Sequence, residues 1–192
     1  MAQNLLCLLV LASAVAGLLP SAKERNEILE AHREIRKRVE PTAANMLAME
    51  YFDHLENLAL SWVSLCRPEK PDIKRFPKYR DFGAILTASQ EETFNYTDFL
   101  TSYEVEKLSY NYEKNYCTGY CKNYLQLVTA TSNRVGCATM NCDKKGSSGY
   151  KIKHLGLCLY KHAIGVNERP YKKGTSCSGC FERAWCIQKQ CF

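Results

Sequence analysis

The sequence lacks the short motifs that mark many hydrolases. No Gly-x-Ser-x-Gly motif occurs, so nothing indicates a serine nucleophile on a sharp strand-to-helix turn. Histidine is scarce, with four in 192 residues. His32 shares one face of an expected helix with Ile28, Ile35 and Val39, and no second histidine lies near it in sequence. We therefore expect a hydrogen-bonded core histidine and not a ligand.

Long apolar runs, internal repeats and low-complexity linkers are also missing after the N-terminal segment. No run in that part is long enough to span a bilayer. The net charge is +6, but acidic residues interrupt the basic ones throughout, which argues against a nucleic-acid partner. The positive charge makes acidic membrane surfaces or glycans reasonable neighbours instead.

The N-terminal segment is apolar and short. Residues 5–19 are almost wholly small or apolar, no charged residue precedes Lys23, and the run contains the triplet Ala14-Val15-Ala16. This pattern is typical of a secretory signal peptide over residues 1–16, cleaved after Ala16, with a buried N-terminal helix as the alternative. The sequence thus predicts a secreted, extracellular protein.

Cysteine, in contrast, is abundant. The chain has eleven. Cys7 lies in the signal segment, and the other ten are an even number, which in a secreted protein implies up to five disulfides and no free thiol. From Cys177 the tail reads Cys-x2-Cys-x5-Cys-x4-Cys, which resembles a zinc knuckle superficially, but two disulfides are the better interpretation. The triplet that begins at Asn95, Asn-Tyr-Thr, predicts an N-glycan acceptor on the surface in this setting.

The spacing of apolar residues predicts helices first and strands later. Ser21 and Glu24 form a capping box before a helix over residues 23–39. Residues 67–92 hold three prolines and mixed charges and read as irregular. The other expected elements are helices over residues 49–66 and about 97–108, a short segment near 124–129, and strands over 135–141 and 151–161. This order predicts an α+β fold with helices packed on an antiparallel sheet.

Five segments, in order along the chain, match one family. They are ILEAHREIRKRV, PTAANMLAMEY, LALSWVSLC, CKNYLQLVTATSNRVGCA and LCLYKHAIGVNERPYKKGTSCSGC, and only residues 67–95 match poorly. The chain resembles the secreted CAP domains of cysteine-rich secretory, antigen 5 and pathogenesis-related proteins, and its tyrosine-rich insert looks most like flatworm venom allergen-like proteins. The resemblance implies one domain over residues 17–173, folded as a three-layer α-β-α sandwich, and a hinge-like cysteine-rich tail over residues 174–192.

The resemblance also implies how the cysteines pair. The tail corresponds to the family's hinge and its two crossed bonds. Cys117 and Cys121 are then left over, and their three intervening residues suit a small staple. The expected disulfides are Cys66–Cys142, Cys137–Cys158, Cys117–Cys121, Cys177–Cys186 and Cys180–Cys191.

The family often carries two histidines and two glutamates that bind a divalent metal in a surface cavity. In this sequence Asn123 stands in one histidine position, within residues 122–126, and Ala84 stands in one glutamate position. The other histidine position falls among Arg67, Glu69 and Lys70, and only Glu106 is retained. A carboxylate with an amide is a poor transition-metal site. We expect a degenerate cavity at Lys70, Ala84, Glu106 and Asn123, no metal, no cofactor and no catalytic residue.

Tyrosines gather where the family's sterol-binding loop falls. The resemblance places Tyr110, Tyr112, Tyr116 and Tyr120 in this loop, because they follow the helix of Glu106. Packing of the loop onto its own domain is the alternative, since tyrosine suits both settings. The family's fatty-acid channel would be lined by the first and third helices, through Ile28, Ile35, Leu100 and Tyr103.

These observations favour a secreted, non-enzymatic protein that binds a sterol or a fatty acid, with a possible role at a host–parasite boundary. The alternative is a protein-interaction or immunomodulatory module acting on a host or neighbouring protein. A metal-dependent hydrolase is disfavoured by Asn123 and Ala84.

Overall fold

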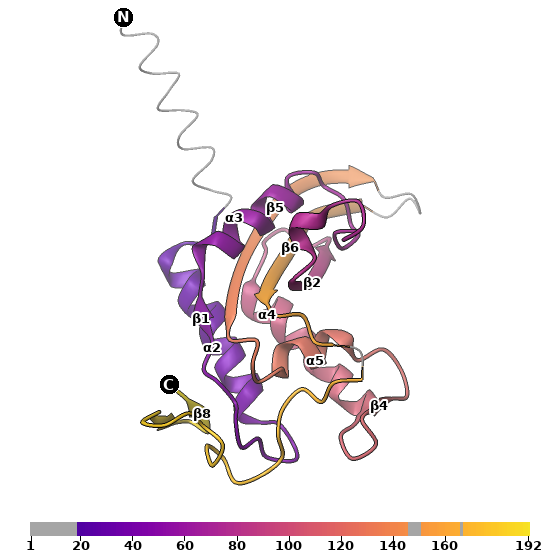
Figure 1. Cartoon of the computed structure of the whole chain (residues 1–192). Helices are drawn as coiled ribbons and strands as arrows, with labels where there is room; N and C mark the ends of the chain where they lie inside the picture. The colour runs from indigo at the N-terminus through magenta and orange to yellow at the C-terminus, as the bar shows by residue number, and fades with distance from the viewer. Residues whose placement is uncertain (1–18, 146–150, 166) are drawn as a thin grey trace, which may run out of the picture.

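The computed structural model describes residues 19–145, 151–165 and 167–192, so the expected signal peptide over residues 1–16 lies outside the described residues. One four-stranded sheet runs through the molecule in the order β1 (Glu50–Tyr51), β5 (Arg134–Lys145), β6 (Lys151–Lys161) and β2 (Phe82–Ser89), with helices on both sides (Figure 1). β1 is parallel to β5, and the other neighbours are antiparallel. In the part of the chain that the structure describes, no helix has the length and apolar character needed to cross a membrane.

In the described residues, five helical segments surround this sheet, and a sixth continues one of them. They are α2 (Ala22–Lys37), α3 (Asp53–Val63), η1 (Pro77–Tyr79), α4 (Tyr96–Thr101), which continues into the 3-10 helix η2 (Ser102–Ser109), and α5 (Lys122–Val128). Two small hairpins complete the fold. They are β3 (Tyr110–Asn111) with β4 (Tyr116–Cys117), and β7 (Cys186–Ile187) with β8 (Gln190–Cys191).

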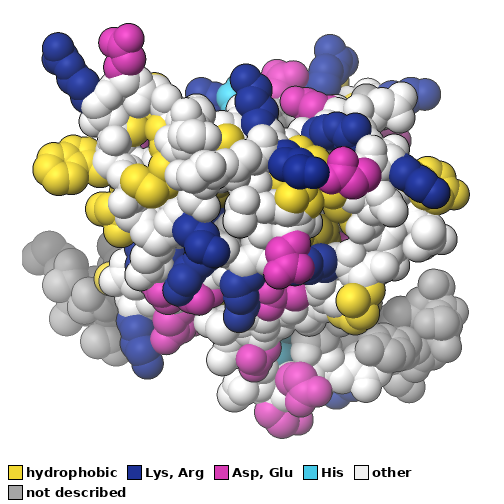
Figure 2. All heavy atoms as spheres, turned by 90° about the horizontal axis from the view of Figure 1, so that it is seen from below, with side chains coloured by type: hydrophobic (Ala, Val, Ile, Leu, Met, Phe, Trp, Pro, Cys, Tyr) yellow, Lys and Arg dark blue, Asp and Glu magenta, His cyan; other side chains and the backbone are white. Residues whose placement is uncertain are grey.

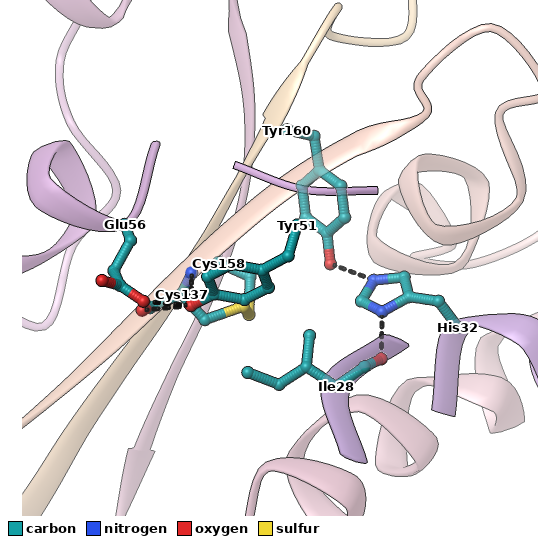
Figure 3. Close-up of a disulfide and its surroundings, with 7 residues drawn as sticks. All are labelled: Ile28, His32, Tyr51, Glu56, Cys137, Cys158 and Tyr160. Atoms are coloured by element: carbon teal, nitrogen blue, oxygen red, sulfur yellow. Dashed lines mark hydrogen bonds between the residues drawn. A yellow bond between two sulfur atoms is a disulfide. The ribbon is translucent and has the colours of Figure 1, made fainter. Parts of the chain in front are cut away.

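The helix α2 begins and packs as its sequence predicts. Ser21 Oγ accepts from the Glu24 N–H, and the Glu24 carboxylate accepts from the Ser21 N–H, which completes the capping box. His32 is fully buried, with Nδ1 2.7 Å from the Ile28 carbonyl oxygen and Nε2 3.0 Å from the Tyr160 hydroxyl (Figure 3). The expectation of a hydrogen-bonded core histidine is confirmed.

The sheet separates two hydrophobic clusters. In β6, Leu155, Leu157 and Leu159 pack with α3 in one cluster, whereas Cys158 and Tyr160 pack with α2, α4 and α5 in the other. Because successive side chains of a strand point to opposite faces, both faces of β6 are buried. The three-layer α-β-α sandwich is therefore confirmed.

Two of the expected helices are shorter than their sequence suggested. The helix expected over residues 49–66 starts at Asp53, because Glu50 N–H donates to Asn133 O and Phe52 N–H donates to Val135 O at the sheet edge. The helix expected over about 97–108 is α-helical only to Thr101 and then tightens into η2. Asn95, the expected glycan acceptor, is exposed and caps α4 by accepting from the Asp98 N–H.

The expectation that residues 67–92 are irregular is wrong for β2. This strand pairs with β6 along its whole length, from Phe82 opposite Lys161 to Ser89 opposite His154. Gly83 allows it to approach α5, since a Cβ there would come within 2.2 Å of the Gln126 side-chain oxygen. The prolines that suggested irregular structure lie before residue 78, ahead of the strand.

Disulfides join the layers and fix the tail, and their pairs are those that the resemblance implied. The tail also pairs with residues 42–48, since Cys191 N–H donates to Met46 O and Ala48 N–H donates to Cys191 O. Sulfur atoms of Cys177, Cys180 and Cys191 lie within 4.8 Å of one another, but all three are oxidised and cannot act as thiolate ligands. The structure contains Cys66–Cys142, Cys117–Cys121, Cys137–Cys158, Cys177–Cys186 and Cys180–Cys191.

Candidate functional site

Three of the four degenerate cavity positions meet at the start of α5. The Glu106 carboxylate accepts from the backbone N–H groups of Asn123 at 2.9 Å and Tyr124 at 3.0 Å, and from the Asn123 side-chain amide at 2.8 Å. The Asn123 side-chain oxygen accepts from the Lys70 ammonium at 2.9 Å. Backbone N–H groups in the first turn of a helix have no partner within the helix. Glu106 therefore caps α5 from a distant part of the chain.

Lys70 supplies the positive charge of this cluster. Burial lowers the pKa of Lys70, the Glu106 carboxylate opposes this shift, and Lys122 adds to it. The resemblance placed one of the family's histidine positions among Arg67, Glu69 and Lys70, and of these Lys70 reaches the Asn123 side chain. The Lys70 ammonium donates hydrogen bonds and offers no lone pair.

These residues do not fit a divalent cation. The Lys70 ammonium would repel the ion, and the Asn123 oxygen already accepts from it. Ala84 has no ligating atom in its side chain. It packs with Phe82 and Leu86 against the hydrophobic cluster that lies between α3 and the sheet. One carboxylate and one amide remain, which is too few ligands for a transition-metal site. The chemistry of this cluster is capping and hydrogen bonding.

The capping role gives a stability prediction. We expect Glu106→Ala to lower the free energy of unfolding by about 2 kcal/mol, because two backbone N–H groups and the Asn123 amide lose a charged acceptor. Urea denaturation with the disulfides intact measures the change. Glu104→Ala is the matched control: this neighbour forms an exposed ion pair with Arg38 and should cost under about 1 kcal/mol. Equal losses in the two variants would contradict the capping role.

A second feature lies beside α5, under the tyrosine-rich loop. A cavity of about 390 Å³ is lined by residues of the β3–β4 hairpin and of α5, and by Ile164, Gly165, Asn167 and Glu168. Its apolar wall includes Tyr110, Tyr116, Leu125 and Ile164. The Cys117–Cys121 disulfide links the hairpin to the residue before α5. The loop is thus tied to the helix that forms the opposite wall.

Hydrogen bonds organise one side of this cavity. The Tyr110 hydroxyl donates to the Asn115 side-chain oxygen at 2.8 Å, and the Asn115 amide donates to Asn167 O at 2.8 Å. Burial raises the pKa of Tyr110, with Arg169 acting in the opposite sense. Tyr110 is therefore a neutral hydroxyl at physiological pH.

The structure divides the four tyrosines expected at the sterol-binding loop. Tyr110 and Tyr116 line the cavity, and Tyr120 lies outside this lining with 58% of its surface exposed. Tyr112 is buried, stacks on Tyr171 with ring centroids 4.9 Å apart, and donates its hydroxyl hydrogen bond to Tyr171 O. Packing onto the domain is therefore observed for Tyr112, whereas sterol binding stays a prediction for Tyr110 and Tyr116.

The residues expected to line a fatty-acid channel are packed in or against the hydrophobic core, and no open channel separates them among the described residues. Ile28, Ile35 and Leu100 are at most 2% exposed and belong to one packed cluster between α2, α4 and the sheet. Tyr103 lies at its edge, and its hydroxyl donates to Leu86 O at 2.9 Å. An acyl chain would reach these side chains only if α2 and α4 moved apart.

Sequence reasoning missed part of the cavity wall. Lys122 and Leu125 adjoin the predicted position Asn123, but Ile164 and Glu168 are some forty residues further along the chain. Both residues lie in the segment LCLYKHAIGVNERPYKK, which matched the family pattern, but no site residue was predicted in it. Contact between this segment and the tyrosine-rich loop arises only from the folded chain.

The fold and the disulfide pattern define a class of protein: disulfide-linked α-β-α sandwich domains of the cysteine-rich secretory type. The family model described as "CAP: Cysteine-rich secretory protein family" matches residues 29–160. The chain belongs to this family.

Individual relatives support the assignment. The chain is 30% identical over 192 residues to GLIPR1-like protein 1 of Homo sapiens, covering 95% of this chain and 78% of that protein. It is 30% identical over 174 residues to peptidase inhibitor R3HDML of Mus musculus, covering 83% and 67%. Neither relative is named as an enzyme. The structure of Schistosoma mansoni venom allergen-like protein 4 matches with a TM-score of 0.65 at 24% identity, covering 81% of this chain and 97% of that one, which shows the shared fold.

Proposed function

We propose that this chain is a secreted, non-enzymatic CAP protein that binds a sterol in the cavity between the tyrosine-rich loop and α5. The observation that carries the proposal is the position of this cavity. It lies where the family resemblance places a sterol-binding loop, and Tyr110 and Tyr116 line it. Its volume of about 390 Å³ is within the range of small-molecule sites.

The chemistry of the lining suits a sterol. Leu125, Ile164 and the two tyrosine rings offer apolar contacts, while Asn115 and Lys122 bring polar groups to the same cavity. A sterol is a rigid apolar body with one hydroxyl, so it loses little conformational entropy on binding. A long flexible fatty acid would lose more and would need a longer cavity.

Binding of this kind needs no metal and no bond-breaking step. The Lys70–Asn123–Glu106 cluster does not fit a cation, and all ten cysteines among the described residues are in disulfides. We therefore expect stoichiometric sterol binding that EDTA leaves unchanged.

Radiolabelled cholesterol tests the proposal, with protein from an oxidising secretory host. We expect Tyr116→Ala to raise the Kd about tenfold, because an aromatic contact of about 1.5 kcal/mol is lost. Tyr120→Ala is the matched control: Tyr120 is as exposed as Tyr116, 58% against 61%, but does not line the cavity. Its Kd should change less than about twofold.

The same assay with a long-chain fatty acid separates the alternatives. Fatty-acid binding that Tyr116→Ala leaves intact would indicate a second site, reached by opening the packed core at Ile28 and Leu100. Absence of saturable binding for both lipids would contradict the proposal and favour a protein-interaction module. Equal weakening by Tyr116→Ala and Tyr120→Ala would contradict the assignment of the cavity.

A further inference from the structure

The C-terminal hairpin exposes large apolar side chains that no packing requirement explains. Trp185 is 75% exposed, Phe181 59%, Ile187 48% and Phe192 43%. All four lie within the last twelve residues. Exposed tryptophan and phenylalanine this close together mark an interaction surface more often than a free one.

The hairpin is held rigidly in this arrangement. Trp185 and Phe192 exchange two backbone hydrogen bonds beside the β7–β8 pair. Crossed disulfides tie Cys186 and Cys191 to the preceding turn of the tail. The buried Gln190 side chain donates to the Arg33 carbonyl oxygen of α2. These aromatic side chains would therefore bind a partner without the entropic cost of ordering a loop.

Basic side chains surround a hollow next to the hairpin. A cavity of about 390 Å³ is lined by Lys37, Arg38, Lys107 and Lys189, with Glu40 as its one acidic residue. Lys189 belongs to the turn between β7 and β8, so the hollow and the aromatic hairpin are continuous at this residue.

Some of the basic side chains that line the hollow form ion pairs with acidic side chains, and Lys189 does not among the described residues. Arg38 pairs with Glu104 at 3.0 Å, Lys37 pairs with Glu34 at 3.1 Å, and Lys107 lies 3.6 Å from Glu40. Residues 172–192 carry four basic residues against one acidic residue. Figure 2, seen from the lower end of Figure 1, shows dark-blue Lys and Arg side chains interspersed with magenta Asp and Glu side chains across this end. Hydrophobic side chains appear at its left edge, the side on which Figure 1 draws the hairpin, and also towards the right.

We propose that this end of the molecule docks on an anionic phospholipid bilayer, with the aromatic side chains of the hairpin in the interface and a headgroup phosphate in the hollow. Tryptophan and phenylalanine partition to the boundary between headgroups and acyl chains. Lysine and arginine close to an anionic leaflet are attracted to its negative surface potential. Apolar contact and charge attraction combine in such surfaces. The docking surface is separate from the sterol cavity.

Tryptophan fluorescence tests this proposal with few ambiguities. The chain has two tryptophans, and Trp62 is 3% exposed with its indole N–H donating to Glu69 O at 2.9 Å. Trp185 is therefore the one that a membrane can reach. We expect vesicles of phosphatidylcholine with phosphatidylserine to shift its emission to shorter wavelength, and salt to reverse the shift. Vesicles of phosphatidylcholine alone should leave the spectrum unchanged.

Vesicle co-sedimentation extends the test to variants. Trp185→Ser should weaken binding to the phosphatidylserine vesicles about tenfold through lost apolar contact, and Lys189→Glu should weaken it about tenfold by reversing one charge. Tyr116→Ala, which alters the sterol cavity, is the control and should bind these vesicles as the unsubstituted protein does. Equal binding to both vesicle types would overturn the proposal, as would a Trp185→Ser variant that binds like the unsubstituted protein.

Discussion

Arg36→Met should lower the free energy of unfolding by about 3–5 kcal/mol, the largest loss that we expect from any single substitution discussed. Arg36 is 1% exposed and, within the described part of the chain, its side chain pairs with no carboxylate. Burial lowers the pKa of Arg36 to about 9, so the guanidinium still carries its charge at neutral pH. Backbone carbonyl groups must stabilise that charge.

Four carbonyl groups do so. The guanidinium donates to Leu47 O at 2.9 and 3.2 Å, to Leu127 O at 2.8 Å, to Thr129 O at 3.0 Å and to Ala130 O at 3.1 Å. The last three acceptors lie at the end of α5 and just beyond it, where helix carbonyls have no intrahelical partner. Methionine fills the volume but donates nothing, so Leu47 O and Leu127 O lose their charged donor. Thr129 O and Ala130 O lose it as well, although each also accepts from a backbone N–H, of Ser132 and of Leu47 respectively.

Urea denaturation with the disulfides intact measures the loss. Arg33→Met is the matched control on the same helix, since the Arg33 side chain pairs with Glu30 near the surface, and its change should stay within about 0.5 kcal/mol. A loss under about 1 kcal/mol for Arg36→Met would contradict the argument, because water would then be satisfying the carbonyl groups.

The burial of Arg36 could not be predicted from the sequence, although the helix that carries it could. The capping box at Ser21 and Glu24 and the stripe of Ile28, His32 and Ile35 are local patterns, and they placed α2 to within two residues. Nothing local marks Arg36 as buried, because its acceptors near α5 are more than ninety residues away. A charged residue beside an apolar stripe is ordinarily solvent-exposed.

The sheet gives a similar contrast. β6 alternates leucine with smaller or aromatic residues, and this pattern identified it in advance. β2 follows several prolines and mixed charges, and its partners in β6 are some seventy residues further along the chain. The local composition around β2 therefore predicted irregular structure. The strand forms nevertheless, because it pairs with β6.

At the candidate site, the family resemblance located single positions but not their contacts. Lys70 and Asn123 were expected as substituted metal ligands, and the structure adds that they bond to each other. The sterol-loop tyrosines were expected as a group, and packing separates Tyr112 from Tyr116. Side-chain contacts depend on the folded backbone, whereas positions can be read from spacing.

The second large effect concerns pH. Burial lowers the pKa of His32 to about 4, with the Arg36 charge acting in the same sense and the hydrogen bond to Ile28 O opposing it. In the unfolded chain a histidine has a pKa near 6.5. Between these two values the unfolded state binds a proton that the folded state does not, so stability falls as the pH falls. The stabilising contribution is complete above about pH 6.5 and is lost towards pH 4.

A shift of this size corresponds to about 3 kcal/mol between pH 7 and pH 4. Other groups also titrate in this range, so the decisive quantity is the difference between the unsubstituted protein and His32→Gln at each pH. We expect that difference in unfolding free energy to decrease by about 3 kcal/mol from pH 7 to pH 4, because glutamine cannot take up the proton.

Tyr160→Phe removes the hydroxyl partner of Nε2 (Figure 3) but keeps the histidine buried, so it should lower stability and retain most of the pH dependence. A difference between the unsubstituted protein and His32→Gln that stays constant with pH would mean that His32 takes up its proton in the folded state as readily as in the unfolded one, and the buried neutral imidazole would then be the wrong description.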